Sequence, residues 1–192
     1  MKDITIGYAF CGSFCTVAKS MKIMRELAAE GNDILPIVSE AVYNTDTRFG
    51  KAEDTVREIE HICGKKALHS IVEAEPIGPK GSLDVLIVAP CTGNTLAKIA
   101  CGITDTTVTM AVKAQLRANK PVVIALASND ALSANLKNIA ALTVRKNIYF
   151  VPMFQDDTQS KPHSLICDFG ELKATVVAAL RGKQIQPIWC VG

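Results

Sequence analysis

The feature that most constrains the fold is a short apolar run in the middle of the chain, Val85-Leu86-Ile87-Val88-Ala89, which Asp84 precedes and Pro90 follows. A run of this length that is rich in β-branched residues predicts a strand buried on both faces, as in a parallel sheet covered by helices. Pro90 has no N–H to donate to a strand ladder, so we expect the strand to end at residues 89–90. Small polar or flexible residues follow, and a helical pattern begins at Leu96. Polar groups therefore gather at the carboxyl end of a buried strand, the edge where open α/β sheets bind ligands.

The same alternation of strand and helix continues through the rest of the chain. Further strands are predicted over residues 5–10, 34–38, 121–126 and 148–152, and helices over residues 15–30, 52–62, 96–100, 106–119, 135–144 and 168–181. Residues 68–72 suit either an edge strand or a helix fragment, residues 77–82 are predicted to form a loop, and Asp105 is placed to cap the helix that follows it. This order predicts an α/β fold, a doubly wound and mostly parallel Rossmann-like sheet with helices on both faces.

The composition excludes several classes of protein. A chain of 192 residues predicts a single domain over residues 1–192 with a sizeable core. Its 48% apolar content and formal net charge of +2 argue against disorder and against the basic surface of a nucleic-acid-binding protein. No apolar run approaches the ~20 residues that cross a bilayer, and residues 1–4 lead into a strand without the pattern of a signal peptide. We therefore expect no nucleic-acid partner and no membrane partner.

Seven cysteines form an odd set without the regular spacing of a disulfide framework, which predicts free thiols and a cytoplasmic protein. Cys11, Cys15, Cys91 and Cys101 come near the ligand-binding edge, where thiols could hold a soft metal. Their spacings match no zinc pattern, and Cys15 and Cys101 occupy apolar helical positions. We expect small core thiols and no metal site.

Four polar segments meet this sheet edge in the predicted fold: residues 11–14, Ser39, residues 90–95 and residues 128–130. Gly12-Ser13 joins the strand over 5–10 to its helix, so backbone N–H groups and a hydroxyl lie at a helix N-terminus, which suits a phosphate. The loop is neither a Gly-x-Gly-x-x-Gly fingerprint nor a P-loop, and an ordinary turn with a capping serine remains the alternative. Together the segments offer hydroxyls, amides and N–H groups, which suit a phosphate and the polar edge of a flat ring.

The segment Pro90-Cys91-Thr92-Gly93-Asn94-Thr95 resembles the Pro-Ala-Ser-Ala-Asn-Thr motif of the flavoprotein superfamily, which includes FMN-dependent cysteine decarboxylases and flavin prenyltransferases. Gly12-Ser13 resembles the first flavin phosphate loop of that superfamily. The resemblance implies FMN as cofactor and a homo-oligomer. The residues that it implies for FMN binding are Gly12, Ser13, Phe14, Ser39, Pro90, Cys91, Thr92, Gly93, Asn94, Thr95, Ser128 and Asn129. A helix cap at Ser39, and an Asn94 side chain bonded to its own loop, remain the alternatives.

The chain resembles the family of dipicolinate synthase B subunits over nearly its whole length, including residues 44–50, 89–90, 92–94, 128–132 and 155–157. This resemblance implies oxidation of a (hydroxy)tetrahydro- or dihydrodipicolinate to dipicolinate during sporulation. It also implies a partner A subunit with a nicotinamide-binding domain. The dicarboxylate needs fixed positive charge, which the planar fork of an arginine supplies.

We accordingly predict that Arg48 and Asp130 contact the substrate. Lys80 and Lys161 are rivals for the carboxylate, and an Arg48 that is solvated or paired with Asp46 is the alternative. The residue types assign no catalytic acid or base.

Two other functions remain open, an FMN-dependent decarboxylase or prenyltransferase and a non-catalytic flavin-binding partner subunit. The resembling decarboxylases use a histidine in the segment that corresponds to residues 44–50, and a later motif rich in methionine, asparagine and tryptophan. This chain has no histidine in the first segment, and its single tryptophan is Trp189, near the C-terminus. These departures argue against a decarboxylase.

Overall fold

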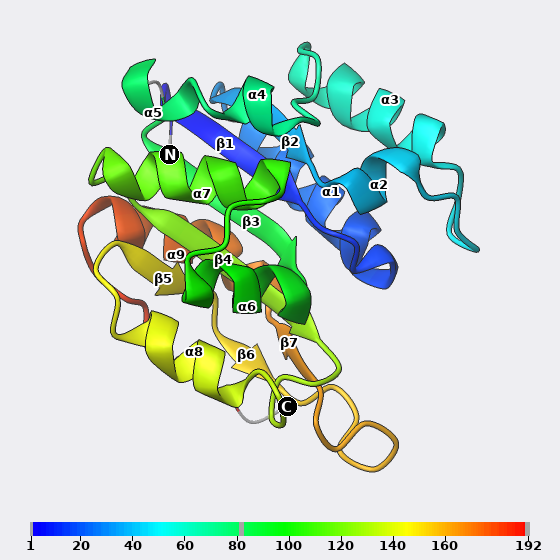
Figure 1. Cartoon of the computed structure of the whole chain (residues 1–192), viewed down its shortest axis with the longest axis vertical. Coiled ribbons are helices and arrows are strands. Elements are labelled where there is room, and N and C mark those ends of the chain that lie inside the picture. Colours follow the sequence, from blue (N-terminus) through cyan, green and yellow to red (C-terminus); the bar gives the residue numbers. More distant parts are fainter. Residues whose placement is uncertain (1, 81–82, 191–192) are drawn as a thin grey trace.

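One sheet organises the residues that the computed structural model describes, which are residues 2–80 and 83–190. Its strands follow the order β2-β1-β3-β4-β7-β6, and β5, which is outside this order, also pairs with β4 (Figure 1). The strands are β1 (Thr5–Phe10), β2 (Asp33–Val38), β3 (Val85–Cys91), β4 (Val122–Ser128), β5 (Ile148–Phe150), β6 (Met153–Phe154) and β7 (Leu165–Cys167). The first five are parallel, and β7 runs antiparallel to both β4 and β6. The mostly parallel α/β sheet is confirmed.

Helices cover both faces of this sheet, as predicted (Figure 1). The helices are α1 (Phe14–Ala29), α2 (Glu40–Asn44), α3 (Ala52–Cys63), α4 (Ile71–Ala74), α5 (Ile77–Lys80), α6 (Gly93–Cys101), α7 (Thr107–Arg117), α8 (Leu136–Thr143) and α9 (Leu172–Leu180), and a 3-10 turn (Phe169–Glu171) precedes α9. Apolar residues of α1, α3 and α9 pack on one face, and those of α6, α7 and α8 pack on the other. No helix among the described residues is long and apolar enough to cross a membrane.

Alternating side chains of the central strands fill the two cores. In β1, Tyr8 and Phe10 enter the core under α1, whereas Ala9 enters the opposite core. The buried Tyr8 hydroxyl donates to the Ser20 carbonyl at 3.1 Å, and the Ser20 hydroxyl donates to the Ala89 carbonyl of β3 at 2.7 Å. These buried polar groups are satisfied, so they bind α1 to β1 and β3 without a desolvation penalty.

The strand β3 continues past the end predicted for it. It includes Pro90 and reaches Cys91, because the pairing with β4 shifts register between Val88 and Cys91. The missing N–H of Pro90 therefore falls at an irregularity of the ladder, while its carbonyl accepts from Cys11 N at 3.1 Å. The next helix, α6, begins at Gly93 rather than Leu96, because the Thr92 hydroxyl accepts from Thr95 N and caps it.

Several further boundaries differ from the prediction. Thr106, not Asp105, caps α7, and Asp105 instead pairs with Lys98 at 2.8 Å. Residues 77–80 form α5 rather than a loop, and residues 81–82 lie outside the described residues. Leu68 forms one parallel bridge to Ile37, and α4 follows it, so each expectation for residues 68–72 holds in part. The strand predicted over 148–152 is present as β5 over residues 148–150, but it is not the last strand, because two short strands, β6 and β7, follow it.

Candidate functional site

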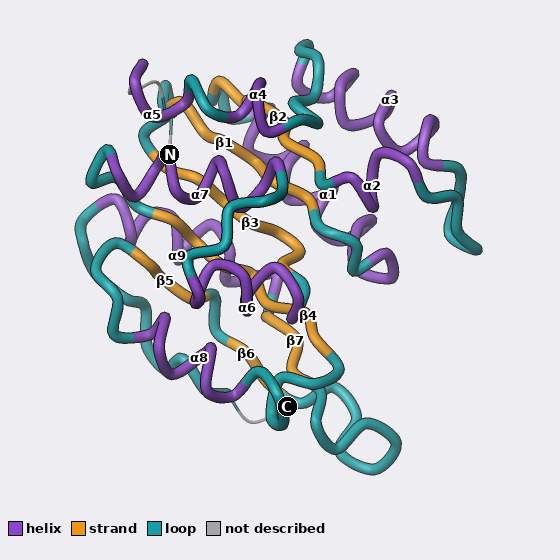
Figure 2. Tube along the Cα trace, in the orientation of Figure 1, coloured by secondary structure: helices purple, strands orange, loops and turns teal. Residues whose placement is uncertain are grey.

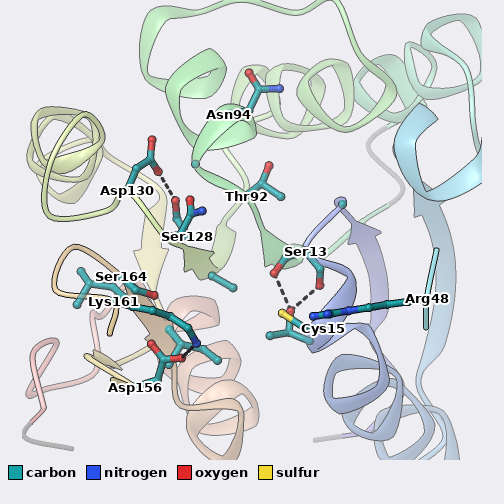
Figure 3. A pocket seen from close by; sticks show the side chains of 17 residues that line it. Ser13, Cys15, Arg48, Thr92, Asn94, Ser128, Asp130, Asp156, Lys161 and Ser164 are labelled. Carbon is teal, nitrogen blue, oxygen red and sulfur yellow. Dashed lines mark hydrogen bonds and ion pairs between the residues drawn. The ribbon is translucent and has the colours of Figure 1, made fainter. Parts of the chain in front are cut away.

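A cavity of about 630 Å³ lies at the carboxyl ends of β1, β3 and β4, and we refer to it as the strand-end cavity (Figure 3). It is lined by Gly12, Ser13, Cys15, Thr16, Arg48, Thr92, Gly93, Asn94, Ala127, Ser128, Asn129, Asp130, Asp156, Lys161, Ser164, Leu165 and Ile166. The loops after three parallel strands thus converge here, as the topology of an open α/β sheet requires. The position agrees with the sheet edge that the sequence indicated.

The first wall of the cavity is the N-terminal turn of α1. The Thr16 hydroxyl donates to the Ser13 carbonyl at 2.8 Å, and its oxygen lies 3.1 Å from the Ser13 hydroxyl oxygen. Ser13 makes no side-chain cap, and it lines the cavity. The N-terminus of this 16-residue helix carries the positive end of its dipole, although Thr16 N already donates to the Ser13 carbonyl at 3.0 Å. This wall therefore offers hydrogen-bond donors to an anion.

The second wall is the start of α6. The Thr92 hydroxyl is already engaged, because it accepts from Thr95 N at 3.3 Å and donates to the Thr95 hydroxyl at 3.1 Å. Asn94 follows in the first turn with an exposed side chain, which the part of the chain that the structure describes leaves without a hydrogen-bond partner. Asn94, rather than Thr92, is therefore the free polar side chain of this turn.

The third wall is a polar network after β4. The Ser128 hydroxyl donates to one Asp130 carboxylate oxygen, and Asn135 Nδ2 donates to the other at 2.9 Å. Asn138 Nδ2 in turn donates to Asn135 Oδ1 at 2.8 Å. Both Asp130 oxygens thus have partners inside the protein, and the network folds the loop back onto Gly93.

Two cations reach the cavity from opposite sides (Figure 3). Arg48 comes from the loop between α2 and α3, where its guanidinium carbon lies 4.9 Å from the centre of the Phe49 ring. The alternative of a pair with Asp46 is not observed, because Asp46 accepts from Ala52 N at 2.9 Å, and Arg48 pairs with no carboxylate among the described residues. Lys161 comes from the loop between β6 and β7 and lies 3.2 Å from Asp156 Oδ2.

Asp156 stays ionised beside Lys161. Partial burial raises the pKa of its carboxyl, but the hydrogen bonds from Lys161 and Ser164 outweigh this effect and hold the pKa below its usual range. The loop itself is ordered by its own bonds, since Asp157 Oδ1 accepts from Ser160 N at 2.8 Å and Gln155 Nε2 donates to the Pro162 carbonyl at 3.0 Å. Figure 2 shows this loop projecting past the end of β7.

Buried thiols lie beneath the cavity. Burial raises the pKa of the Cys11 thiol to about 11 and raises that of Cys91 well above its usual value. Both are therefore neutral near pH 7, and neither is a thiolate nucleophile. Among the described residues, no three acidic, histidine or cysteine side chains come close enough to hold a metal ion.

Five of the predicted flavin-binding residues do not line the cavity: Phe14, Ser39, Pro90, Cys91 and Thr95. Ser39 caps α2 by accepting from Val42 N at 3.4 Å, which is the alternative that the sequence left open. Cys91 is buried in the core, and Thr95 is 8% exposed. Cys91 is the last residue of β3, which is buried along its whole length, whereas Thr95 lies in α6, where its N–H and hydroxyl are bonded to Thr92.

The cavity also contains residues that the sequence analysis did not assign to it, among them Cys15, Thr16, Asp156 and Ser164. The expectation that Cys15 and Cys101 are core thiols was wrong, because both are exposed. Cys15 lies in the first turn of α1, at the sheet edge and beyond the core that Val17 enters. Lys161, which the sequence offered only as an alternative to Arg48 for the substrate carboxylate, also lines the cavity. The side chain of the other alternative, Lys80, lies outside the described residues.

Comparison with known proteins gives a consistent result. A family model described as Flavoprotein matches residues 1–182. The B subunit of dipicolinate synthase from Bacillus subtilis (strain 168) is 43% identical over 188 residues, which cover 98% of this chain and 94% of that protein. The crystal structure of the corresponding B subunit from Bacillus halodurans has 42% identity and a TM-score of 0.89, and the match covers 97% of this chain and 96% of that one. Burkholderia xenovorans DmrB, solved in complex with FMN, shares the fold with a TM-score of 0.67 at 20% identity, over 93% of this chain and 96% of that one.

Proposed function

Because this chain belongs to the flavoprotein family, we propose that its strand-end cavity binds FMN and that it acts as the flavin-binding B subunit of a dipicolinate synthase. The observation that carries the proposal is the convergence of the α1 and α6 N-termini and the loop after β4 on one cavity. The similarity to the Bacillus subtilis dipicolinate synthase protein over 98% of this chain supports the choice within the family.

The donors of the cavity fit a flavin phosphate. The first turn of α1 presents backbone N–H groups together with the Ser13 hydroxyl, and a helix N-terminus favours a doubly charged anion. Gly12 precedes them on the rim, where a Cβ would lie 3.3 Å from the Ala41 Cβ, so a larger residue would crowd the loop. We assign Gly12 and Ser13 to the phosphate.

The start of α6 fits the polar edge of the flavin ring. The Asn94 amide can donate and accept at once, which matches a ring edge that carries both carbonyl oxygens and nitrogens. Thr92, Gly93, Ser128 and Asn129 form the adjoining walls. FMN, when bound, supplies an acceptor for two electrons as a hydride, and the task of these residues is to orient the ring toward the substrate.

The substrate in this proposal is a dihydro- or (hydroxy)tetrahydrodipicolinate, which carries two carboxylates. Arg48 binds one of them, because its guanidinium has no carboxylate partner among the described residues and lines the cavity. Asp130 does not bind the dianion directly. Its carboxylate would repel the substrate, and both its oxygens already accept from Ser128 and Asn135. We assign Asp130 the role of positioning Ser128.

The remaining parts of the proposal concern the assembly. A partner A subunit supplies the nicotinamide cofactor, copies of this chain associate with one another, and the complex works in the cytoplasm during sporulation. The seven free cysteines support a reducing compartment. Both dipicolinate synthase relatives are B subunits, which supports a need for a second subunit.

Titration of the purified chain with FMN, followed by flavin absorbance and fluorescence, tests the cofactor. A protein that stays colourless and shows no titration at high micromolar FMN would overturn the proposal. Assays of dipicolinate formation with and without the A subunit then separate an active B subunit from a non-catalytic partner. Aminovinyl-thiol formation or prenyl transfer by the same preparation would instead assign it to a decarboxylase or prenyltransferase.

A further inference from the structure

The loop between β6 and β7 places a second cation at the strand-end cavity, on the side away from Arg48 (Figure 3). Arg48 follows β2, at one end of the order β2-β1-β3-β4-β7-β6, and Lys161 precedes β7, near the other end. The loops that we assign to the flavin follow β1, β3 and β4, which lie between them. A ligand that lies across this edge therefore has one cation at each end.

The two cations differ in what they bind within the protein. Arg48 has no carboxylate partner among the residues that the structure describes, whereas Lys161 lies 3.2 Å from Asp156 Oδ2. The Lys161 side chain is 54% exposed and that of Asp156 is 31% exposed. An ion pair this exposed contributes little to stability, so a carboxylate from outside can replace Asp156 at Lys161 with little cost.

The backbone around Lys161 is held in place independently of this pair. Lys161 N donates to the Asp157 carbonyl at 3.0 Å, and Ser164 N donates to the Lys161 carbonyl at 3.0 Å. The neighbouring Leu132 N also donates to the His163 carbonyl at 2.9 Å, which ties the loop to the segment after β4. Exchange of the carboxylate therefore requires a rotation of the Lys161 side chain and no refolding of the loop.

We propose that Lys161 binds the second carboxylate of a dicarboxylate ligand and that Asp156 is an internal counter-ion, which holds Lys161 until the ligand replaces it. This inference rests on the proposed function, since it names how the same site recognises a dianion. It makes the cavity selective for a diacid over a monoacid, because a monoacid satisfies Arg48 alone. It also predicts opposite effects when the two charges of this ion pair are removed: loss of the Lys161 charge weakens the binding of the diacid, and loss of the Asp156 charge strengthens it.

Calorimetric titration of the FMN-loaded protein with pyridine-2,6-dicarboxylate and with pyridine-2-carboxylate tests this inference. Lys161→Gln should weaken the binding of the diacid roughly tenfold and leave the binding of the monoacid unchanged, as expected for the loss of one charge-assisted bond. Asp156→Asn should strengthen the binding of the diacid about threefold, because it removes the carboxylate that competes for Lys161. Lys146→Gln, which removes an exposed cation that does not line the cavity, is the matched control.

Three outcomes would overturn the inference. Lys161→Gln could weaken the binding of both acids equally, or Asp156→Asn could weaken the binding of the diacid. Lys161→Gln could also weaken the binding of FMN and leave the binding of riboflavin unchanged. The last result would assign Lys161 to the flavin phosphate. A protein that binds no FMN would refute the proposed function instead. The preference for the diacid, measured on the flavin-free chain and its variants, would then still decide the role of Lys161.

Discussion

Gly93 lies so close to Ser128 that a Cβ atom on Gly93 would stand 2.5 Å from the Ser128 hydroxyl oxygen. The same Cβ would lie 2.6 Å from Asn135 Nδ2 and 2.6 Å from Asp130 Oδ1. The absence of a side chain at the first residue of α6 therefore lets the loop after β4 close against it. Two walls of the strand-end cavity depend on this one contact.

Gly93→Ala should therefore disturb stability and the cavity together. Overpacking of this kind costs typically ~1–3 kcal/mol in the free energy of unfolding. Because Ser128 and Asp130 must move, we also expect weaker FMN binding. Gly102→Ala is the control, since its Cβ would meet nothing within 4 Å but its φ of +71° strains the backbone. Gly102→Ala should lower stability and leave the FMN dissociation constant unchanged. If both variants weaken FMN binding equally, the contact of Gly93 with the loop after β4 does not determine FMN binding.

Asn94→Ala should weaken FMN binding without a comparable loss of stability, because Asn94 is exposed and binds no described residue. A ring edge that loses its partner costs ~1–3 kcal/mol in binding free energy. Asn94→Asp keeps the size but removes the N–H donors and adds a negative charge, so it should bind FMN at least as weakly. Fluorescence titration measures both variants, and wild-type affinity in either would exclude Asn94 from the site.

Arg48→Ala should cost ~1.5–3 kcal/mol in kcat/KM for the reconstituted two-subunit complex, as for a charge-assisted bond to the substrate. Arg48→Lys keeps the charge but loses the planar fork, so it should raise KM more than it changes FMN affinity. Steady-state kinetics at several substrate concentrations measure both effects. An unchanged kcat/KM in Arg48→Ala would mean that the carboxylate is held elsewhere.

Cys15 and Cys101 give an internal comparison for FMN binding, because both are exposed but only Cys15 lines the cavity. Saturation with FMN should slow alkylation of Cys15 several-fold, because the ligand covers it, and leave the rate at Cys101 unchanged. Peptide mass spectrometry after brief iodoacetamide treatment measures the two rates. Equal rates with and without FMN at Cys15 would place the flavin elsewhere. The same experiment should detect all seven cysteines as thiols once the chain is unfolded.

The buried thiols predict a loss of stability at alkaline pH. Burial raises the pKa of Cys11 to about 11, whereas an unfolded thiol titrates near pH ~8.5. The contribution of Cys11 to the free energy of unfolding is fully present below the unfolded pKa and is lost as the pH rises toward the folded pKa, by ~1.4 kcal/mol per pH unit. Urea denaturation at pH 7.5, 9 and 10 should show a decline that is shallower in Cys11→Ala. Cys101→Ala, at an exposed thiol, is the control. If the free energy of unfolding declines with pH at the same rate in the wild-type protein and in both variants, this account is contradicted.

The local pattern of the sequence determined the main layers of the fold. Apolar runs such as residues 85–89 have the period and composition of buried strands, and Gly64 and Gly102 end helices with a positive φ, which glycine adopts readily. The same pattern placed Gly12, Ser13, Asn94 and Ser128 at one sheet edge, because the carboxyl ends of parallel strands share that edge. These features depend on neighbours that are close in the chain.

Only the tertiary structure decided which side chains complete the cavity. Lys161 and Asp156 reach it because β7, three residues long, pairs antiparallel with β4, and so short a strand has no period of its own to predict. Ser39 turned out to cap a helix, and Pro90 lies inside a strand, because hydrogen-bond partners that the local pattern does not reveal were available there. Periodicity records which face of an element is buried, whereas the meeting of loops distant in the chain depends on how the elements pack.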